Sequence, residues 1–222
     1  TCVSGSVATL DLHSNQLTGS IPTSIGDLTG LTRLNLSVNQ LTGTIPAEFG
    51  NLVHLLLLSL GRNALSGSIP SELGGLLDLR ILDLQVNQLD GPIPSELGGL
   101  VDLEFLDLGH NQLTGGIPIS FGGLVALKSL DLSVNPLGGA IPAELGNLFA
   151  LQTLNLFSDE LRGSIPPEIG DLASLVELVL AGNAIGGSIP GEFENLISLE
   201  RLNLRHNQLG GSIPTELGAL AS

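Results

Sequence analysis

The sequence predicts an α/β solenoid built from nine stacked copies of one 24-residue unit. The first observation is an asparagine that returns once in every unit at the same position, with Asp159 as the single exception. The second is a frame of leucine, glycine, isoleucine and proline that repeats around each asparagine without insertion or deletion. A fixed period of this length is typical of repeat proteins, in which each unit packs only on its neighbours. The asparagine column is Asn15, Asn39, Asn63, Asn87, Asn111, Asn135, Asn183 and Asn207.

Each unit predicts the same local structure, illustrated by residues 31–52. Leu34 and Leu36 alternate with outward residues, which predicts a short strand, and stacked copies form a parallel sheet with strands about 4.8 Å apart. The asparagine amide both donates and accepts, so it can satisfy backbone groups in its own turn and in the next repeat. The alternation from Leu41 to Ile45 predicts a second short strand. Pro46 ends that strand and begins a 3-10 or helical turn, and Gly50 is expected to end the turn in a left-handed conformation.

Composition limits the kinds of partner. The formal net charge of -15 argues against nucleic acid and against anionic membrane surfaces. The longest apolar runs, such as residues 55–58, fall far short of the roughly 18 residues that a spanning helix needs. Much of the acidity comes from one glutamate column, two residues after each recurring proline, where a carboxylate favours a helical start. Its members are Glu48, Glu72, Glu96, Glu144, Glu168, Glu192 and Glu216.

The ends of the chain differ from the repeats. Residues 1–6 are expected to be the end of an N-terminal cap, and residues 7–222 to form the nine repeats without a C-terminal cap. Cys2 is either a free thiol or half of a disulfide whose partner lies outside the chain, and its place before the first repeat favours the disulfide. Without a cap, core residues of the last unit stay exposed, so we expect the segment to self-associate or fray. They are Leu199, Leu202, Leu204, Leu209, Ile213, Leu217 and Leu220.

The repeated frame resembles the plant-type leucine-rich repeat of receptor-like kinases, receptor-like proteins and polygalacturonase-inhibiting proteins. The Gly-x-Ile-Pro element carries the likeness to this subclass, and residues 1–7 resemble the end of the N-terminal cap, whose final cysteine is disulfide-bonded. The resemblance implies a right-handed superhelix with a concave parallel sheet. It also implies an extracellular or cell-surface location and recognition of a peptide or protein ligand or a co-receptor.

The positions that vary between units point to a binding surface on the concave sheet. Leu57, Ile81 and Phe105 occupy one outward column in three consecutive units, with Val86 beside them and Phe157 further along. A contiguous exposed apolar patch is a stronger sign of interaction than a scattered leucine. We predict that these residues anchor a partner; the alternative is that drift or crowding at the strand edge placed them there.

Charged columns give weaker candidates. Asp83, Asp107 and Asp131 stack one strand apart, so their carboxylates should repel and raise one another's pKa values, which would suit a cationic group or an ion. Aspartate is also common at this point of the frame in the family that the repeat resembles, so the column is better explained without a ligand.

Basic residues gather near the end of the chain. Arg201 and Arg205 form a small basic group, far from Arg33 near the start, that could bind a carboxylate. The alternative is that these are solvated surface charges.

Two further positions stand out. In the seventh unit Asp159 replaces the ladder asparagine, so an acceptor-only group stands where an amide normally donates and accepts. This is either tolerated decay or a local distortion. Asn35 begins the one glycosylation sequon, Asn35-Leu36-Ser37, and a glycan there would point into the concave face.

Catalysis is not predicted. The four histidines lie in different repeats, and the chain has no metal-ligand spacing, phosphate loop or cofactor motif, so neither an enzyme nor a cofactor is expected. The leading interpretation is a ligand-recognition module of a receptor ectodomain. The alternatives are a secreted inhibitor of a microbial hydrolase and an intracellular scaffold of a multidomain GTPase. The outward columns of the concave sheet are too irregular for an ice-binding face.

Overall fold

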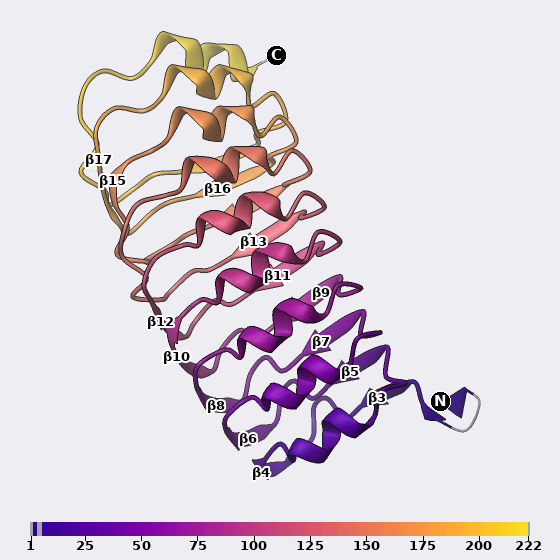
Figure 1. The fold of residues 1–222 in the computed structure, drawn as a ribbon. Helices are drawn as coiled ribbons and strands as arrows, with labels where there is room; N and C mark the ends of the chain where they lie inside the picture. The colour runs from indigo at the N-terminus through magenta and orange to yellow at the C-terminus, as the bar shows by residue number, and fades with distance from the viewer. Residues whose placement is uncertain (1, 4–5, 222) are drawn as a thin grey trace.

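Stacked turns of chain make a solenoid that rises from the N-terminus to the C-terminus, with helical turns along one side (Figure 1). The computed structural model describes residues 2–3 and 6–221, and the side chains of residues 7–218. Two short strands precede the repeats, β1 (Cys2–Val3) and β2 (Ser6–Val7), and they pair antiparallel. The α/β solenoid predicted from the repeat period is confirmed.

A parallel sheet of nine strands within the described residues lines the concave side. Each strand pairs with the equivalent strand of the next unit, so Leu57 lies opposite Ile81, and Ile81 opposite Phe105. The predicted register is therefore confirmed. In order along the sheet the strands are β3 (Thr9–Asp11), β5 (Arg33–Asn35), β7 (Leu57–Ser59), β9 (Ile81–Asp83), β11 (Phe105–Asp107), β13 (Ser129–Asp131), β14 (Thr153–Asn155), β16 (Glu177–Val179) and β18 (Arg201–Asn203).

The second strands form a side sheet that is interrupted in the sixth unit. The break lies at Pro136, which replaces the usual Gln and has no N–H to donate to a ladder. Gly138 follows with φ of 66°, whereas its equivalents Thr42, Ser66, Asp90 and Thr114 do not have a positive φ. The side sheet contains β4 (Thr18–Ser20), β6 (Gln40–Gly43), β8 (Ala64–Gly67), β10 (Gln88–Pro92) and β12 (Gln112–Thr114), and beyond the break β15 (Arg162–Ser164) and β17 (Ala184–Gly186).

Helical turns of the 3-10 type form the convex side, and proline stands immediately before the first eight of them. Proline has a φ that suits the residue before a helical turn, so the predicted start of the turn at the Ile-Pro element is confirmed. The second strand ends earlier than predicted, at Gly43 in β6 and not at Pro46. The helices are η1 (Thr23–Asp27), η2 (Ala47–Asn51), η3 (Ser71–Gly75), η4 (Ser95–Gly99), η5 (Ile119–Gly123), η6 (Ala143–Asn147), η7 (Pro167–Asp171), η8 (Gly191–Asn195) and η9 (Thr215–Ala221).

Two glycines show different reasons for their place in the frame. Gly43 has φ of 78°, a left-handed conformation that glycine adopts without steric cost. Gly50 does not, so the expected left-handed conformation at the end of the helical turn is wrong. Instead, a Cβ atom at Gly50 would lie 2.8 Å from the Cβ of Glu72. Glycine is needed there because successive helical turns approach one another closely.

The core is a continuous stripe of leucine and isoleucine, and the asparagine ladder closes its edge. Asn111 donates through Nδ2 to the carbonyl oxygens of Leu84 (3.1 Å), Leu108 (2.9 Å) and Gly109 (3.3 Å). Its Oδ1 accepts from the N–H of Leu89 at 3.0 Å. One amide thus satisfies groups in its own unit, as predicted, but its second set of partners lies in the preceding unit and not in the next one.

Three valines in the turn before the ladder asparagine adopt a left-handed conformation that the sequence did not reveal. Val38, Val86 and Val134 have φ of 56°, 52° and 60°. This region is rare for β-branched residues because Cβ crowds the backbone. The eighth unit has Gly182 at the same place, with φ of 74°. The stack therefore imposes the turn on whichever residue occupies this column.

Candidate functional site

Three apolar side chains form a strip on the open face of the nine-stranded sheet. Leu57, Ile81 and Phe105 lie on β7, β9 and β11 and are half-buried. They face outward because their neighbours Leu58, Leu82 and Leu106 are fully buried in the core. The predicted adjacency is confirmed, and we call these three residues the apolar strip.

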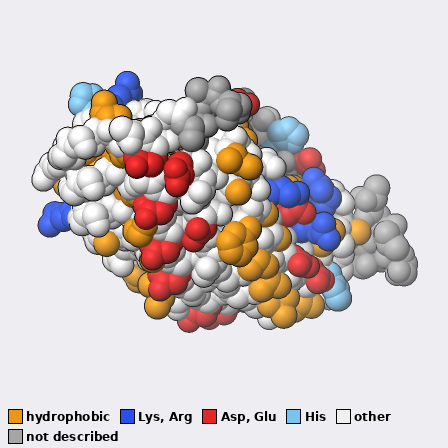
Figure 2. Space-filling model, turned by 90° about the horizontal axis from the view of Figure 1, so that it is seen from above, with side chains coloured by type: hydrophobic (Ala, Val, Ile, Leu, Met, Phe, Trp, Pro, Cys, Tyr) orange, Lys and Arg blue, Asp and Glu red, His pale blue; other side chains and the backbone are white. Residues whose placement is uncertain are grey.

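A column of charged residues borders the apolar strip, one residue earlier in each repeat unit. Glu104 accepts a hydrogen bond from Arg80 Nη1 at 3.3 Å and from Lys128 Nζ at 2.6 Å. The hydrogen bond from Lys128 is the main reason that the pKa of Glu104 is lowered. These side chains are solvent-exposed, so the pairs stabilise the fold little. Figure 2 shows Lys and Arg side chains grouped beside hydrophobic ones.

Ile81 and Phe105 of the strip line a hollow of about 280 Å³ together with the charged column, and we call it the first hollow. The apolar residues come from the predicted column, while the charged residues were not singled out from the sequence. They could have been found, because Arg80, Glu104 and Lys128 occupy the same position in three consecutive units with alternating charge. The lining residues are Arg80, Ile81, Glu104, Phe105, Lys128 and Ser129.

A second hollow of about 300 Å³ lies further along the same face. It contains Phe157, which the sequence left isolated, together with Arg205 from the predicted basic group. Phe157 and Arg205 share one outward column and lie two units apart. This second hollow is lined by His110, Ser133, Val134, Asn155, Phe157, Val179, Asn203 and Arg205.

The other predicted cations lie in different surroundings. Arg201 forms a two-point pair with Glu177, with Nε and Nη2 donating at 3.0 and 2.8 Å. This pairing raises the pKa of Arg201. Arg33 is exposed on β5, near the opposite end of the sheet from β18. The structure therefore does not unite Arg33 with Arg201 and Arg205.

The three aspartates lie in register on neighbouring strands, and each carboxylate accepts a hydrogen bond from another group of the protein. Asp107 is 8% exposed and accepts from the N–H of Gly109 at 3.0 Å. Asp83 accepts from Ser59 Oγ at 2.7 Å, and Asp131 accepts from Asn155 Nδ2 at 2.8 Å. Burial raises the pKa of Asp107 to about 6, with smaller contributions from the charges of Asp131 and Asp83. The predicted direction is confirmed for Asp107, but repulsion is not the main cause.

Three other predicted residues have defined places. Val86 is 39% exposed at the end of its turn, beside the open face. Asn35 is half-buried, and its Oδ1 accepts from the N–H and hydroxyl of Ser37 at 3.1 and 2.7 Å. Cys2 belongs to β1, and its side chain lies outside the described ones. Its disulfide, like the glycan at Asn35, stays a prediction.

Asp159 is the most unusual group near this face. Its side chain is 0% exposed, Oδ1 accepts from the N–H of Asn135 at 3.1 Å, and Oδ2 has no hydrogen-bond partner. Burial raises its pKa to about 8, and the charge of Asp131 adds to the shift. Glu160 has a positive φ of 57°, whereas Ser158 belongs to the column that is left-handed in every unit. The structure thus shows both a lost hydrogen bond at Oδ2 and a backbone departure at Glu160.

Within residues 2–3 and 6–221, no three His, Cys, Asp or Glu side chains gather in a way that could hold a metal ion. Across that same part of the chain, none of the helices has the length and apolar character to cross a lipid bilayer.

Comparison with known proteins gives a consistent family assignment. A model of the family described as Leucine rich repeat matches residues 5–65, 30–89 and 94–137. A second, described as Leucine Rich Repeat, matches residues 174–196 and 198–220. Among curated proteins, no relative matches the chain.

Solved structures include two similar plant receptors. The Arabidopsis receptor kinase HAESA, in complex with the peptide hormone IDA and the co-receptor SERK1, has 37% identity and a TM-score of 0.91 over 99% of this chain. The plant peptide hormone receptor RGFR1, in complex with RGF2, has 37% identity and a TM-score of 0.81 over 96% of this chain. This chain spans 38% of the length of each of those two.

For a third similar structure, the match spans a larger share of the other protein's chain. A plant ice-binding protein has 31% identity and a TM-score of 0.76, and the match covers 96% of this chain and 76% of that chain.

Proposed function

The chain belongs to the leucine-rich repeat family, and from this premise we propose that it binds a peptide or protein ligand on the concave face. The observation that carries the proposal is the row of outward side chains containing the apolar strip and both hollows. An extended ligand crossing the strands could place successive side chains in the two hollows. The similar receptor structures contain peptide hormones, which supports a ligand of this class.

The finer assignment is a segment of a cell-surface receptor ectodomain that binds without catalysis, with a co-receptor as a further partner. In this proposal Leu57, Ile81, Phe105 and Phe157 contact the ligand, and Val86 lies at the edge of the contact. A hydrolase inhibitor and a GTPase scaffold are the alternatives. The charged residues Arg33, Asp83, Asp107, Asp131, Arg201 and Arg205 remain weaker candidates, and among them Arg205 has the best placement because it lines the second hollow.

The test uses a random dodecapeptide library displayed on phage and selected on the purified protein. Thr153 lies on β14 beside Ser129 of the first hollow. Thr153→Trp is therefore expected to obstruct the face and weaken selected peptides at least tenfold. Ile119→Trp, at a 69%-exposed position on the convex side, is the matched control and should leave affinity unchanged. Selection of no peptides, or equal affinity of both variants, would refute concave-face recognition.

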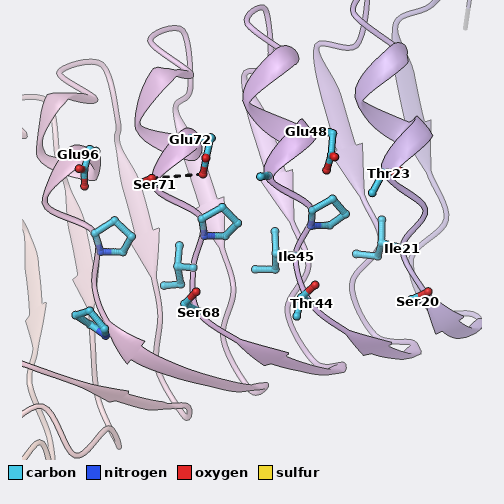
Figure 3. Close-up of a pocket in the computed structure, with 16 residues that line it drawn as sticks. Ser20, Ile21, Thr23, Thr44, Ile45, Glu48, Ser68, Ser71, Glu72 and Glu96 are labelled. Atoms are coloured by element: carbon cyan, nitrogen blue, oxygen red, sulfur yellow. Dashed lines mark hydrogen bonds between the residues drawn. The ribbon is translucent and has the colours of Figure 1, made fainter.

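A second candidate function, adsorption to ice, is favoured by the side sheet. Its first three strands and the residues that follow two of them carry a repeated set of hydroxyl groups. Parallel strands repeat about every 4.8 Å, so the hydroxyl groups recur at a regular spacing, as contact with a crystal lattice requires. Figure 3 shows Ser20, Thr44 and Ser68 on successive turns. The array consists of Thr18, Ser20, Thr42, Thr44, Ser66 and Ser68.

Inhibition of ice recrystallisation tests this second candidate. Thr42→Lys combined with Thr44→Lys places two bulky charges at the centre of the array and should abolish inhibition. Ser164→Lys, an exposed position of the same side sheet beyond the break, should keep it. Absence of inhibition by the unmodified protein, or its survival in the double variant, would exclude an ice-binding face.

We also propose that the 222-residue segment self-associates through its last unit. Ile213 is 79% exposed, and Leu202, Leu204 and Leu209 are only partly buried. Sedimentation should show concentration-dependent association, and a monomer at all concentrations would contradict it.

A further inference from the structure

We infer that the first hollow anchors an acidic–apolar pair of ligand residues, with a bulky apolar side chain between Ile81 and Phe105 and an Asp or Glu carboxylate on Arg80 and Lys128. This inference rests on the proposed binding of a peptide or protein on the concave face. It adds the chemistry of the residues that the first hollow selects.

The size and floor of the hollow suit one large apolar side chain. Its volume is about 280 Å³, just below the range of about 300–1,000 Å³ typical of small-molecule pockets. Ile81 and Phe105 are directly opposite in the sheet and only partly covered by their neighbours. A ligand side chain between them would bury apolar surface that now faces water, which is the main source of affinity in such contacts.

At the rim of the first hollow, two cations share a single carboxylate, so a second carboxylate can bind there. Glu104 uses Oε1 for Arg80 and Oε2 for Lys128, so one carboxylate serves two cations. An ammonium has three donors and a guanidinium five, so most of their donors are left for other partners. The side chains of Arg80 and Lys128 are 58% and 53% exposed. The neighbouring positions of this column, Leu56 and Gln152, carry no charge. A ligand carboxylate would thus complete the alternation of charge.

The negative net charge of the protein limits how many acidic residues the ligand can carry and where on the ligand they can lie. At -15 the whole chain repels a strongly acidic ligand at long range. Arg80, Glu104 and Lys128 together carry an excess of one positive charge, which favours a single carboxylate at this rim, whereas Asp83, Asp107 and Asp131 add negative charge on the other side of the apolar strip. We therefore expect the acid to lie within two positions of the apolar residue, with the rest of the ligand neutral or basic.

In the test, the dodecapeptides that are selected from the phage library are sequenced. Because each peptide is fused to the coat protein, it has no free C-terminal carboxylate. The selected peptides should be enriched in Asp or Glu within two positions of Leu, Ile or Phe. A synthetic peptide of the most enriched sequence should bind Arg80→Gln/Lys128→Gln at least tenfold more weakly. Glu104→Gln removes the competing internal carboxylate, so the same peptide should bind this variant more tightly. Arg162→Gln, an exposed arginine on the side sheet, is the matched control and should bind as the unmodified protein does.

The outcomes separate this inference from the proposed function. Peptides that are sensitive to Thr153→Trp but show no acidic–apolar enrichment, or no response to Arg80→Gln/Lys128→Gln, would overturn the anchor and leave concave-face binding intact. Peptides that are insensitive to Thr153→Trp would overturn both. Tighter binding by Glu104→Gln is the result that loss of a merely structural ion pair would not produce.

Discussion

Asp159→Asn is expected to stabilise the protein, and the gain should grow as pH rises from 4 to 8. The carboxylate is fully buried, and Oδ2 has no partner. An asparagine would restore the amide donor that its equivalents aim at backbone carbonyls, as Asn183 does toward Leu156 (2.7 Å) and Leu180 (3.0 Å). The variant would thus complete a ladder that is continuous in the neighbouring units.

The pH dependence follows from the raised pKa. The folded state holds the Asp159 proton up to about pH 8, whereas the unfolded chain releases it near the ordinary value of 3.8. Folding therefore takes up a proton between these values, and stability falls as pH rises through the window, by about 1.4 kcal/mol for each pH unit. Below pH 4 the penalty vanishes because both states are protonated. The asparagine variant lacks this dependence.

Urea unfolding of both proteins at pH 5 and pH 8 measures the effect. The difference in unfolding free energy should be larger at pH 8 by a few kcal/mol. Glu160→Gln removes an exposed charge from the next position and serves as the control for net charge, with a small effect at either pH. A variant gain that does not change between pH 5 and pH 8 would show that Asp159 is not buried in its neutral form.

Asn111→Ala is expected to destabilise the protein by about 3–5 kcal/mol. The side chain is 8% exposed, and its removal leaves the Leu89 N–H and the carbonyls of Leu84, Leu108 and Gly109 without this partner. An unsatisfied buried polar group costs about 1–3 kcal/mol. Some of these carbonyls keep other ladder partners, so the losses do not simply add.

The matched control is Asn15→Ala in the first unit. Asn15 is exposed, and among the described residues its Nδ2 donates to Leu12 and His13 of its own turn. Because water can replace those bonds, we expect a loss below about 1.5 kcal/mol. Urea denaturation of both variants checks the pair, and equal losses would show that the inter-unit bonds of Asn111 do not stabilise the stack.

Much of the fold follows from the period, because identical spacing forces equivalent residues into register. That is why the adjacency of Leu57, Ile81 and Phe105 could be predicted, and why proline before each helical turn was recognised. The break in the side sheet also had a signal, since Pro136 occupies a strand position. The close approach at Gly50 and the left-handed valines had none, because both result from the way the units stack.

The site was less predictable than the fold, for a physical reason. Sequence columns give neighbours but not the tilt of a side chain, so they did not show that Asp107 turns inward to Gly109. Nor did they show that Phe157 and Arg205 share a hollow, since this depends on side-chain directions across two units. The charged column of Arg80, Glu104 and Lys128 was visible in the spacing and needed only to be compared with its apolar neighbour.

The most direct test of concave-face recognition is a crystal structure of the protein bound to a selected peptide. Our account predicts electron density for the peptide across β9 to β16 on the outward face of the nine-stranded sheet, with an apolar side chain between Ile81 and Phe105. Density over the 3-10 helices or on the side sheet, with the first hollow occupied only by water, would contradict it.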